Sequence, residues 1–342
     1  MSFLTNIAEI TGNQYAAQGK TTNDNRTTID TGSYVLNALL SGSIYGGASS
    51  NAVTAYAGES GTGKTFLVLS IIRSFLESNE NGSVVFFESE GAIDRSMFVD
   101  RNINVDQVYI VPVTTIQDFR TQALKILSSY EEQKDKEPIL FVLDSLGMLS
   151  TNKEVTDAEA GDDKRDMTRA QLIRGTFRIL SLKLSMLGVP MYITNHTYQT
   201  IGMFATQELG GGSGLKYAAS TIIMLSKKKV QEEGSVVGNI IHCKTYKSRL
   251  SKENQMIDIK LFYDTGVDKY YGLLDLAEKY EIVKKVGTRY ELPDGRKDFG
   301  KTIYESPEKY FTDEMMEKLD EAAKEEFSYG FRGEKDGGQI AT

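Results

Sequence analysis

The stretch AVTAYAGESGTGKTFLVLSIIRSFL, residues 52–76, carries the pattern G-x-x-x-x-G-K-[ST] as Gly58, Gly63, Lys64 and Thr65. An apolar run precedes this pattern, and apolar residues at helical spacing follow it. A phosphate chain needs a cradle of backbone N–H groups and a helix N-terminus, which a glycine-rich turn between strand and helix supplies. The sequence therefore predicts a nucleotide-binding loop here, and an ordinary glycine turn is the weaker alternative.

Each position of this loop has a predicted role in binding ATP and Mg²⁺. Lys64 is expected to reach the β- and γ-phosphate oxygens as a point charge, and the Thr65 hydroxyl is expected to ligate Mg²⁺. The predicted nucleotide-binding residues of the loop are Gly58, Glu59, Ser60, Gly61, Thr62, Gly63, Lys64 and Thr65.

The composition is typical of a soluble cytoplasmic enzyme without a membrane partner. The 342 residues, 40% hydrophobic and 25% charged, suffice for one large domain with smaller appendages. No apolar run is long enough for a membrane span, and we expect no signal peptide. The single cysteine, Cys243, cannot form an internal disulfide and fits a reducing compartment. The net charge of −8 argues only mildly against nucleic acid, since phosphate contact depends on local patches.

Composition shifts divide the chain into four parts. Residues 1–30 hold too little apolar surface for a domain and are expected to form a docking arm, with a disordered tail as the alternative. Residues 31–270 form the predicted core, and 271–330 are expected to form a small helical, turn-rich lobe. The tail at 331–342 is expected to be disordered.

Apolar runs alternate with helical patterns through the core. After the run before the glycine loop, further strands are predicted at 82–90, 107–113, 138–147 and 190–195. This alternation predicts an α/β fold with a doubly wound, mostly parallel sheet. Three more predicted strands, expected to extend the sheet, lie at 221–227, 239–249 and 256–264.

Polar side chains end several of these strands, where ligands of open α/β sheets gather. Asp144 follows a run of apolar residues, a pattern typical of the aspartate that holds Mg²⁺ through water, although a helix cap is the alternative. Glu88 and Glu90 end an earlier strand, and their spacing does not choose between them. His196 follows another strand and could either sense the γ-phosphate or simply end the strand.

Two polar or Gly/Ser/Thr-rich stretches, 151–166 and 197–216, are predicted to be loops beside the nucleotide. Met203 and Phe204 lie in the second stretch, and such an apolar pair is costly to expose unless a partner or nucleotide bases pack on it. From the residues alone, the chain is predicted to be an Mg²⁺-dependent ATP hydrolase with two mobile loops.

Several motifs together resemble the RecA recombinase family, including its phage UvsX-type members. They are GESGTGKT, ESEG at 88–91, LDSLG at 143–147, DMTRA at 166–170, NHTY at 195–198, GGGSGLKYAAS after Met203-Phe204, and KSR at 247–249. The resemblance runs in order over about residues 31–285. It implies a RecA-like P-loop ATPase core with an N-terminal oligomerisation arm and a small C-terminal lobe. It also implies a DNA-dependent ATPase that forms helical filaments on single-stranded DNA and exchanges strands with duplex DNA in recombination, repair and replication.

The resemblance assigns further roles at the nucleotide. Glu90 matches a catalytic glutamate that activates water, and general-base assistance of this kind is worth about 10²- to 10⁴-fold. Lys247 and Arg249 match two lysines that act on the γ-phosphate of the neighbouring protomer, and Asp94 is assigned to nucleotide binding. His196 stands where bacterial members have a glutamine that senses the γ-phosphate. The catalytic candidates are thus Glu90, Lys64, Lys247, Arg249 and His196.

The resemblance also makes 151–166 and 197–216 the two DNA-binding loops. The DNA-binding candidates are Arg169, Met203, Phe204, Gly211, Gly212 and Lys216. The arm is expected to dock on the next protomer, with Tyr15 as a candidate anchor, in a head-to-tail contact that does not close. A single-strand-binding protein and a recombination mediator are expected partners. A hexameric helicase motor and a non-hydrolysing or kinase-like ATP switch remain as alternatives.

Overall fold

The computed structural model describes residues 7–13, 15–16, 27–162, 166–199, 207–210, 213–232 and 234–330. The predictions for Met203, Phe204, Gly211, Gly212 and the 331–342 tail lie outside the described residues.

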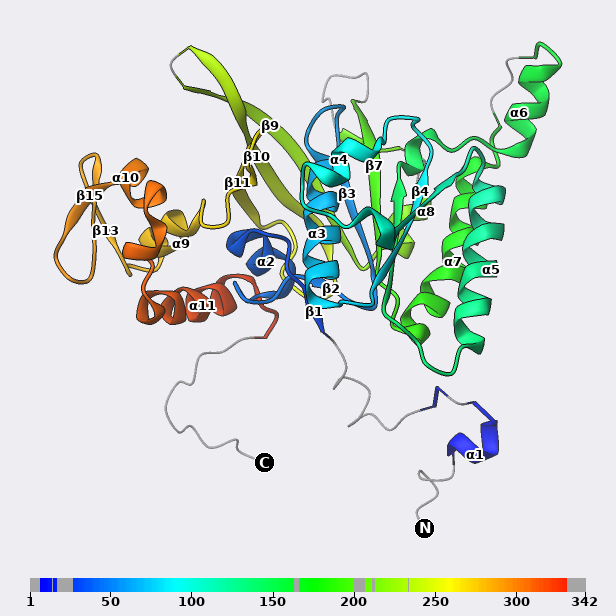
Figure 1. Cartoon of the computed structure of the whole chain (residues 1–342), viewed down its shortest axis with the longest axis horizontal. Coiled ribbons are helices and arrows are strands. Elements are labelled where there is room, and N and C mark those ends of the chain that lie inside the picture. The colour runs from blue at the N-terminus through cyan, green and yellow to red at the C-terminus, as the bar shows by residue number, and fades with distance from the viewer. Residues whose placement is uncertain are drawn as a thin grey trace.

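A ten-stranded sheet runs through the centre of the molecule in the order β12-β11-β10-β9-β3-β7-β6-β4-β5, with β8 paired to β7 (Figure 1). The pairs from β5 to β9 along this path are parallel, and those from β9 to β12 are antiparallel. The strands are β3 (Val53–Gly58), β4 (Ser83–Glu88), β5 (Val108–Pro112), β6 (Ile139–Asp144), β7 (Met191–Gln199), β8 (Gln207–Leu209), β9 (Thr221–Glu232), β10 (Ser235–Ser248), β11 (Met256–Phe262) and β12 (Gly266–Val267). The predicted α/β fold with a mostly parallel sheet is confirmed.

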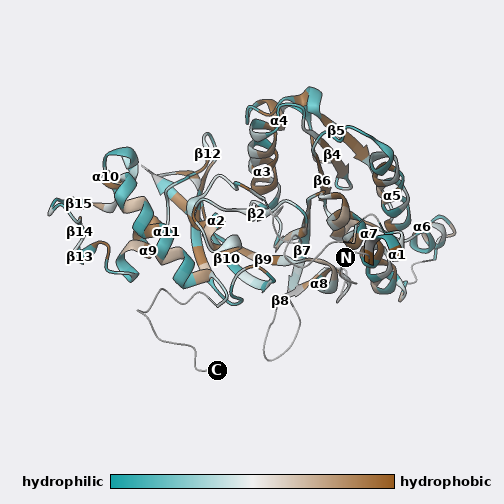
Figure 2. Ribbon diagram, turned by 90° about the horizontal axis from the view of Figure 1, so that it is seen from below, coloured by the Kyte–Doolittle hydropathy of each residue, from teal (hydrophilic) through white to brown (hydrophobic). Residues whose placement is uncertain are grey.

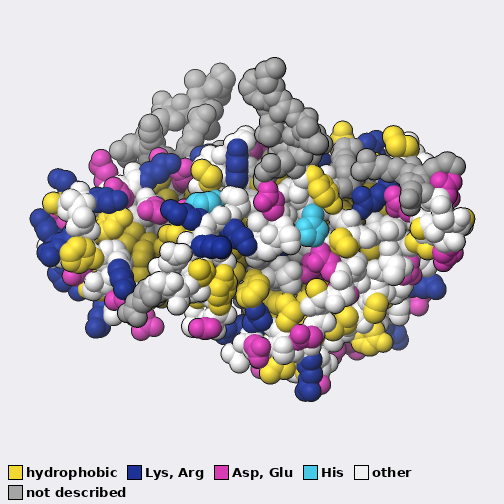
Figure 3. All heavy atoms as spheres, turned by 90° about the horizontal axis from the view of Figure 1, so that it is seen from above, with side chains coloured by type: hydrophobic (Ala, Val, Ile, Leu, Met, Phe, Trp, Pro, Cys, Tyr) yellow, Lys and Arg dark blue, Asp and Glu magenta, His cyan; other side chains and the backbone are white. Residues whose placement is uncertain are grey.

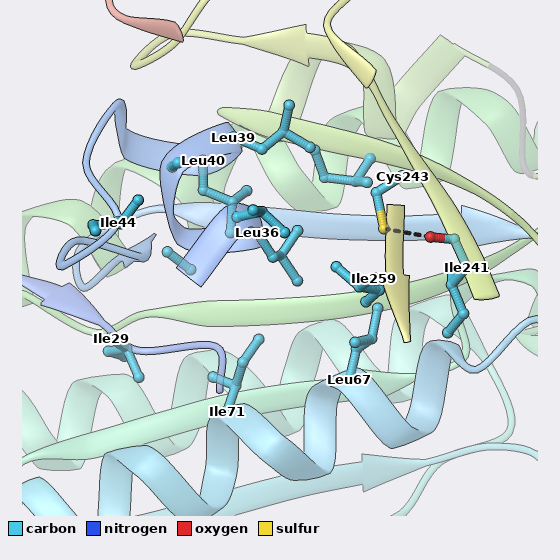
Figure 4. Close-up of a cluster of buried hydrophobic side chains, with 14 of the residues drawn as sticks. Ile29, Leu36, Leu39, Leu40, Ile44, Leu67, Ile71, Ile241, Cys243 and Ile259 are labelled. Atoms are coloured by element: carbon cyan, nitrogen blue, oxygen red, sulfur yellow. Dashed lines mark hydrogen bonds between the residues drawn. The ribbon is translucent and has the colours of Figure 1, made fainter. Parts of the chain in front are cut away.

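Helices cover both faces of this sheet, and Figure 2 shows their apolar sides turned towards it. The core helices are α2 (Tyr34–Ser41), α3 (Lys64–Ser78), α4 (Arg95–Val99), α5 (Ile116–Glu132), α6 (Asn152–Glu159), α7 (Arg169–Leu187) and α8 (Ser213–Ala218). Because side chains alternate across a strand, Phe86 packs in the cluster under α2 and α3, whereas Phe87 packs under α5 and α7. In the first cluster, α2, α3, β10 and β11 meet around the free, buried thiol of Cys243 (Figure 4).

The first predicted loop, 151–166, contains a helix that has no apolar periodicity. Helix α6 occupies part of 151–166 and buries none of its residues, so no apolar stripe marks it. Its start is fixed by a capping box, in which the Thr151 hydroxyl accepts from the Glu154 N–H and the Glu154 carboxylate accepts from the Thr151 N–H. The T-x-x-E spacing was the signal that could have predicted this helix.

The 271–330 lobe contains a small antiparallel sheet besides its helices. The lobe consists of α9 (Leu273–Lys279), β13 (Lys284–Val286), β14 (Arg289–Glu291), β15 (Lys297–Phe299), α10 (Gly300–Glu305) and α11 (Asp313–Phe327). The sequence predicted a helical, turn-rich lobe but not this sheet, because three-residue strands with mostly exposed side chains show no periodicity.

The lobe shares its hydrophobic core with the larger domain. Leu319 of α11 belongs to the same buried cluster as Leu36 of α2, and the two helices pack together. The Asp320 carboxylate accepts hydrogen bonds from the Ser43 hydroxyl at 2.5 Å and the Ile44 N–H at 3.0 Å. These buried contacts attach the lobe firmly to the start of the core.

The described part of the arm contains α1 (Ile7–Thr11) and contacts the core of its own chain. The Tyr15 hydroxyl donates to the Glu131 carboxylate on α5 at 2.8 Å. A short pair, β1 (Thr28–Ile29) with β2 (Ala48–Ser49), follows at the start of the core. Within the described ranges, no helix is both long and apolar enough to cross a membrane.

Candidate nucleotide-binding and catalytic site

The glycine loop joins β3 to α3 at the carboxyl edge of the sheet. Gly63 is the residue before the helix and has a φ of 91°, a left-handed conformation that favours glycine. A Cβ atom at this position would lie 2.8 Å from the Cδ1 atom of Ile241. The backbone turn therefore favours the second glycine of the pattern, and the Ile241 side chain of β10 packs closely against it. The helix N-terminus that follows directs its free N–H groups towards a bound anion.

Lys64 lies within the loop and is only 6% exposed. Its ammonium donates to the carbonyl oxygens of Gly58 at 3.1 Å and Glu59 at 2.9 Å. Burial lowers the pKa of Lys64, while the nearby charges of Glu90 and Asp144 act in the opposite direction. Charged phosphate oxygens bind an ammonium more strongly than neutral carbonyls do, so a nucleotide could displace these partners.

Thr65 and Asp144 meet at the end of β6, and their donor set fits Mg²⁺. The Thr65 hydroxyl donates to Asp144 Oδ2 at 2.8 Å, and the Thr194 hydroxyl donates to Oδ1. Burial raises the pKa of Asp144, which is 4% exposed. No cluster of three or more His, Cys, Asp or Glu side chains with metal-binding geometry occurs in the described chain. Proteins usually hold Mg²⁺ through one or two oxygen-bearing side chains together with substrate phosphates, and Thr65 and Asp144 are side chains of this kind.

Glu90 lies beside Ser145 and His196, which come from different strand ends. Its Oε1 atom accepts from the Ser145 hydroxyl at 2.5 Å and lies 2.9 Å from His196 Nε2. Burial alone would raise the pKa of Glu90, but the hydrogen bonds of Ser145 and His196 and the charge of Lys64 lower it. The carboxylate is therefore held ionised between polar partners at the nucleotide edge of the sheet.

The structure separates Glu90 from Glu88, which the sequence spacing could not do. Glu88 Oε1 accepts from the backbone N–H of Glu90 at 2.9 Å and of Ala92 at 3.2 Å. Glu88 thus holds the turn after β4, whereas Glu90 meets His196. Asp94 caps α4 by accepting from the Met97 N–H at 3.2 Å, and its role in nucleotide binding stays a prediction.

The two residues expected to act on a neighbour lie at the far end of β10. The Lys247 ammonium donates to the carbonyls of Lys216 and Ala219, both at 2.7 Å, and burial lowers the pKa of Lys247. Arg249 is exposed, and its backbone N–H donates to the Ser220 carbonyl at 3.1 Å. In the described part of the chain, no hydrogen bond or ion pair connects either side chain to the glycine loop.

Two DNA-binding candidates lie within the described residues. The Arg169 guanidinium donates to the Gly147 carbonyl at 2.8 Å and to the Leu149 carbonyl at 2.9 Å, so it ties α7 to the end of β6. Lys216 is exposed, with its ammonium 4.8 Å from the centre of the Tyr246 ring. Their predicted contacts with DNA stay predictions.

Sequence reasoning missed two residues at the site, Ser145 and Lys227. Ser145 bonds to Glu90, and its position directly after Asp144 could have suggested it. Lys227 donates to the Gly61 carbonyl at 2.5 Å from β9, a contact that no sequence signal announces. Figure 3 views the molecule from above relative to Figure 1. In this view, Lys and Arg side chains gather on the side where the β9–β10 hairpin projects.

Comparison with known proteins agrees with this architecture. A family model described as the RecA N-terminal domain matches residues 4–268. The chain is 31% identical to the "Recombination and repair protein" of Enterobacteria phage T4, and the alignment covers 73% of this chain and 63% of that protein. It is 28% identical to "Protein RecA" of Borrelia hermsii (strain HS1 / DAH), with 85% of this chain and 80% of that protein covered.

The chain is also 24% identical to "Protein RecA" of Macrococcus caseolyticus, covering 89% of this chain and 84% of that protein. It spans less than two thirds of the length of the phage relative, but more of the bacterial ones. The family match extends from the arm through the glycine loop, Asp144 and His196 to the sheet extension. This chain therefore belongs to the RecA family.

Proposed function

We propose that this chain is a DNA-dependent ATPase that assembles on single-stranded DNA and exchanges strands with duplex DNA in recombination, repair and replication. Membership of the RecA family supports the proposal, as does the similarity to the recombination and repair protein of phage T4. The observation that carries it is the Glu90 carboxylate, which contacts His196 beside Lys64, Thr65 and Asp144. ATP and Mg²⁺ are the cofactors to which this set of side chains is suited.

The chain's own residues divide the work at the nucleotide. Bound Mg²⁺-ATP would supply the phosphorus centre and the charge of the metal. Lys64 and the loop N–H groups bind phosphate oxygens, and Thr65 and Asp144 would hold the metal and its water. Glu90, an ionised carboxylate beside Ser145 and His196, orients a water molecule and accepts its proton.

His196 connects the nucleotide edge to the second predicted DNA loop. The backbone around it forms the stem of 197–216: its carbonyl accepts from the Gly210 N–H at 2.8 Å, and the Asn195 amide donates to the Gly210 carbonyl at 2.8 Å. Thr197 pairs with Leu209 in the next register position. A phosphate oxygen that competes with Glu90 for the His196 ring nitrogen would therefore shift the stem of the loop proposed to hold DNA.

Assembly is proposed to complete the site. Lys247 and Arg249 would reach the γ-phosphate of the next protomer. Cations delivered there increase the rate of hydrolysis by about 10³- to 10⁵-fold in comparable enzymes. In the lone chain the Lys247 ammonium is held by two carbonyls, which it would exchange for phosphate.

The arm is proposed to join protomers head to tail into an open filament. Glu131 binds Tyr15 of its own chain and also pairs with Lys183 at 2.9 Å. We assign the Glu131 carboxylate, held by Lys183, as the acceptor for the Tyr15 hydroxyl of a neighbouring copy. By family resemblance, a single-strand-binding protein, a recombination mediator and a cytoplasmic setting belong to the proposal as well.

Electron microscopy with single-stranded DNA and a slowly hydrolysed ATP analogue tests the proposal, together with ATPase assays with and without DNA. Open helical filaments and DNA-stimulated turnover are expected, and the Lys64→Ala variant should show neither turnover nor stimulation. Closed rings would favour a helicase motor, and turnover that DNA does not change would favour an ATP switch.

A further inference from the structure

Lys227 reaches the glycine loop because β9 is longer than its neighbour β3. The parallel register places Leu225 opposite Gly58, where β3 ends, and β9 continues to Glu232. Since side chains alternate along a strand, Lys227 shares the face of Leu225, which packs in the core under α3. Lys227 is thus the first residue on this face of β9 that lies beyond the end of β3. At this level the residues that follow β3 form the glycine loop.

The contact between Lys227 and the loop is direct. The ammonium donates to the Gly61 carbonyl at 2.5 Å, and a Cβ atom on Gly61 would lie 3.0 Å from that ammonium. Gly61 has a φ of 70°, so its backbone conformation already favours glycine. On the next strand, Ile241 is the register partner of Lys227 and packs against Gly63. The hairpin therefore supports both the apex and the end of the loop.

An exposed lysine is more often a solvated side chain than a functional one, so the neighbouring lysine is the relevant comparison. Lys228 points to the opposite face of β9, and no hydrogen bond joins it to the loop in the described chain. The charge of Lys227 is close enough to Lys64 to contribute to the lowered pKa of Lys64. Lys227 therefore acts on the loop both through a hydrogen bond and through its charge.

We propose that Lys227 is a positioning residue for the nucleotide, which holds the apex of the loop through the Gly61 carbonyl. The Gly61–Thr62 peptide is planar, so fixing its carbonyl also fixes the Thr62 N–H, which closes the turn of the loop by donating to the Glu59 carbonyl at 3.4 Å. Donors that are oriented before a ligand arrives cost less free energy to order on binding. This inference rests on the proposed ATP binding and adds a residue that the glycine-loop pattern does not contain.

Nucleotide affinity of the full-length chain tests the proposal without relying on turnover. Dissociation constants and dissociation rates of a fluorescent ADP and a fluorescent non-hydrolysable ATP analogue would be measured without DNA for Lys227→Met and the matched control Lys228→Met. We expect Lys227→Met to bind about tenfold more weakly, as loss of one charged hydrogen bond implies. Lys228→Met should stay within about twofold of the wild type, since a surface substitution has little effect.

Melting temperatures of the nucleotide-free variants separate positioning from a purely structural role. Equal nucleotide affinities of Lys227→Met and Lys228→Met would overturn the proposal, and so would a lower melting temperature of Lys227→Met with unchanged affinity. If Lys227→Met does not fold, Lys227→Leu, which also lacks a donor, is measured against the same control and judged in the same way. If the wild type binds neither nucleotide, the proposed function fails and this inference fails with it, an outcome distinct from failure of Lys227 alone.

Discussion

The Nε2 atom of His196 lies 2.9 Å from the Oε1 atom of Glu90, so the end of β7 contacts the carboxylate that follows β4. Both residues leave the carboxyl edge of the same sheet, although they are 106 positions apart in the sequence. This contact joins the residue proposed to activate water to the stem of a proposed DNA loop. The contact therefore leads to one prediction for the rate of ATP hydrolysis and another for the stimulation of that rate by DNA.

Glu90→Gln is expected to lower kcat by about 10²- to 10⁴-fold, because the amide cannot accept a proton. Nucleotide affinity should change little, since Lys64 and the loop stay intact. Steady-state ATPase assays and fluorescent-nucleotide titrations measure the two quantities. Glu88→Gln is the matched control, because Glu88 bonds to the backbone of the turn and is proposed to have no part in the chemistry. A larger loss in the control would assign the chemistry to Glu88.

His196→Ala is expected to reduce the stimulation of ATPase by single-stranded DNA about tenfold or more, a typical range for allosteric coupling. The alanine breaks the contact that joins Glu90 to the loop stem. His196→Gln retains a polar side chain and should recover part of the stimulation. Equal stimulation in the wild type and the alanine variant would contradict this role of His196.

Ser145→Ala is expected to raise the pKa of Glu90, because it removes the hydroxyl that donates at 2.5 Å. The acid limb of the pH profile of kcat/KM should therefore move to higher pH. The pKa of this carboxylate also affects the stability of the fold. A carboxylate whose pKa is lowered in the folded state stabilises the fold above its unfolded-state pKa, and this contribution is lost as the pH falls through the folded-state pKa. Profiles with superimposable acid limbs would mean that Ser145 does not influence Glu90.

Arg249→Ala and Lys247→Ala are expected to bind DNA but to lose its stimulation of ATPase, because each removes a cation that assembly would deliver. Arg249→Ala keeps an intact glycine loop, whereas Lys64→Ala keeps the surface that carries Lys247 and Arg249. Mixing the two inactive variants should therefore restore measurable turnover at mixed interfaces. Mixtures that stay as inactive as each variant alone, with filaments still visible, would argue against a shared site.

Tyr15→Phe is expected to change the protein concentration needed for filament assembly by less than about twofold, since it deletes a hydrogen bond that the lone chain makes to Glu131 and that the assembly would make again between copies. Light scattering or sedimentation with DNA and an ATP analogue measures this concentration. Glu131→Ala, which removes the acceptor, should behave in the same way, and a rise of about fivefold or more in either variant would mean that the contact forms only between copies.

Local patterns in the amino-acid sequence were sufficient to predict the glycine loop and the strands and helix around it. The glycine loop, the strand that ends at Asp144 and the helix that follows Gly63 are read from short spacings, because backbone conformation there depends on nearby residues. The capping box of α6 was equally local and could have been predicted. The short strands of the C-terminal lobe could not, since three mostly exposed residues carry no period.

Tertiary structure alone chose among chemically similar side chains. Glu88 and Glu90 are two positions apart and of one type, yet only Glu90 meets Ser145 and His196, which are 55 and 106 residues away. Likewise Lys227 rather than Lys228 reaches Gly61, because strand alternation and the register against β3 direct it there. Spacing along the chain specifies which groups exist and their local conformation, whereas the pairing of distant strands determines which of these groups lie within hydrogen-bond distance.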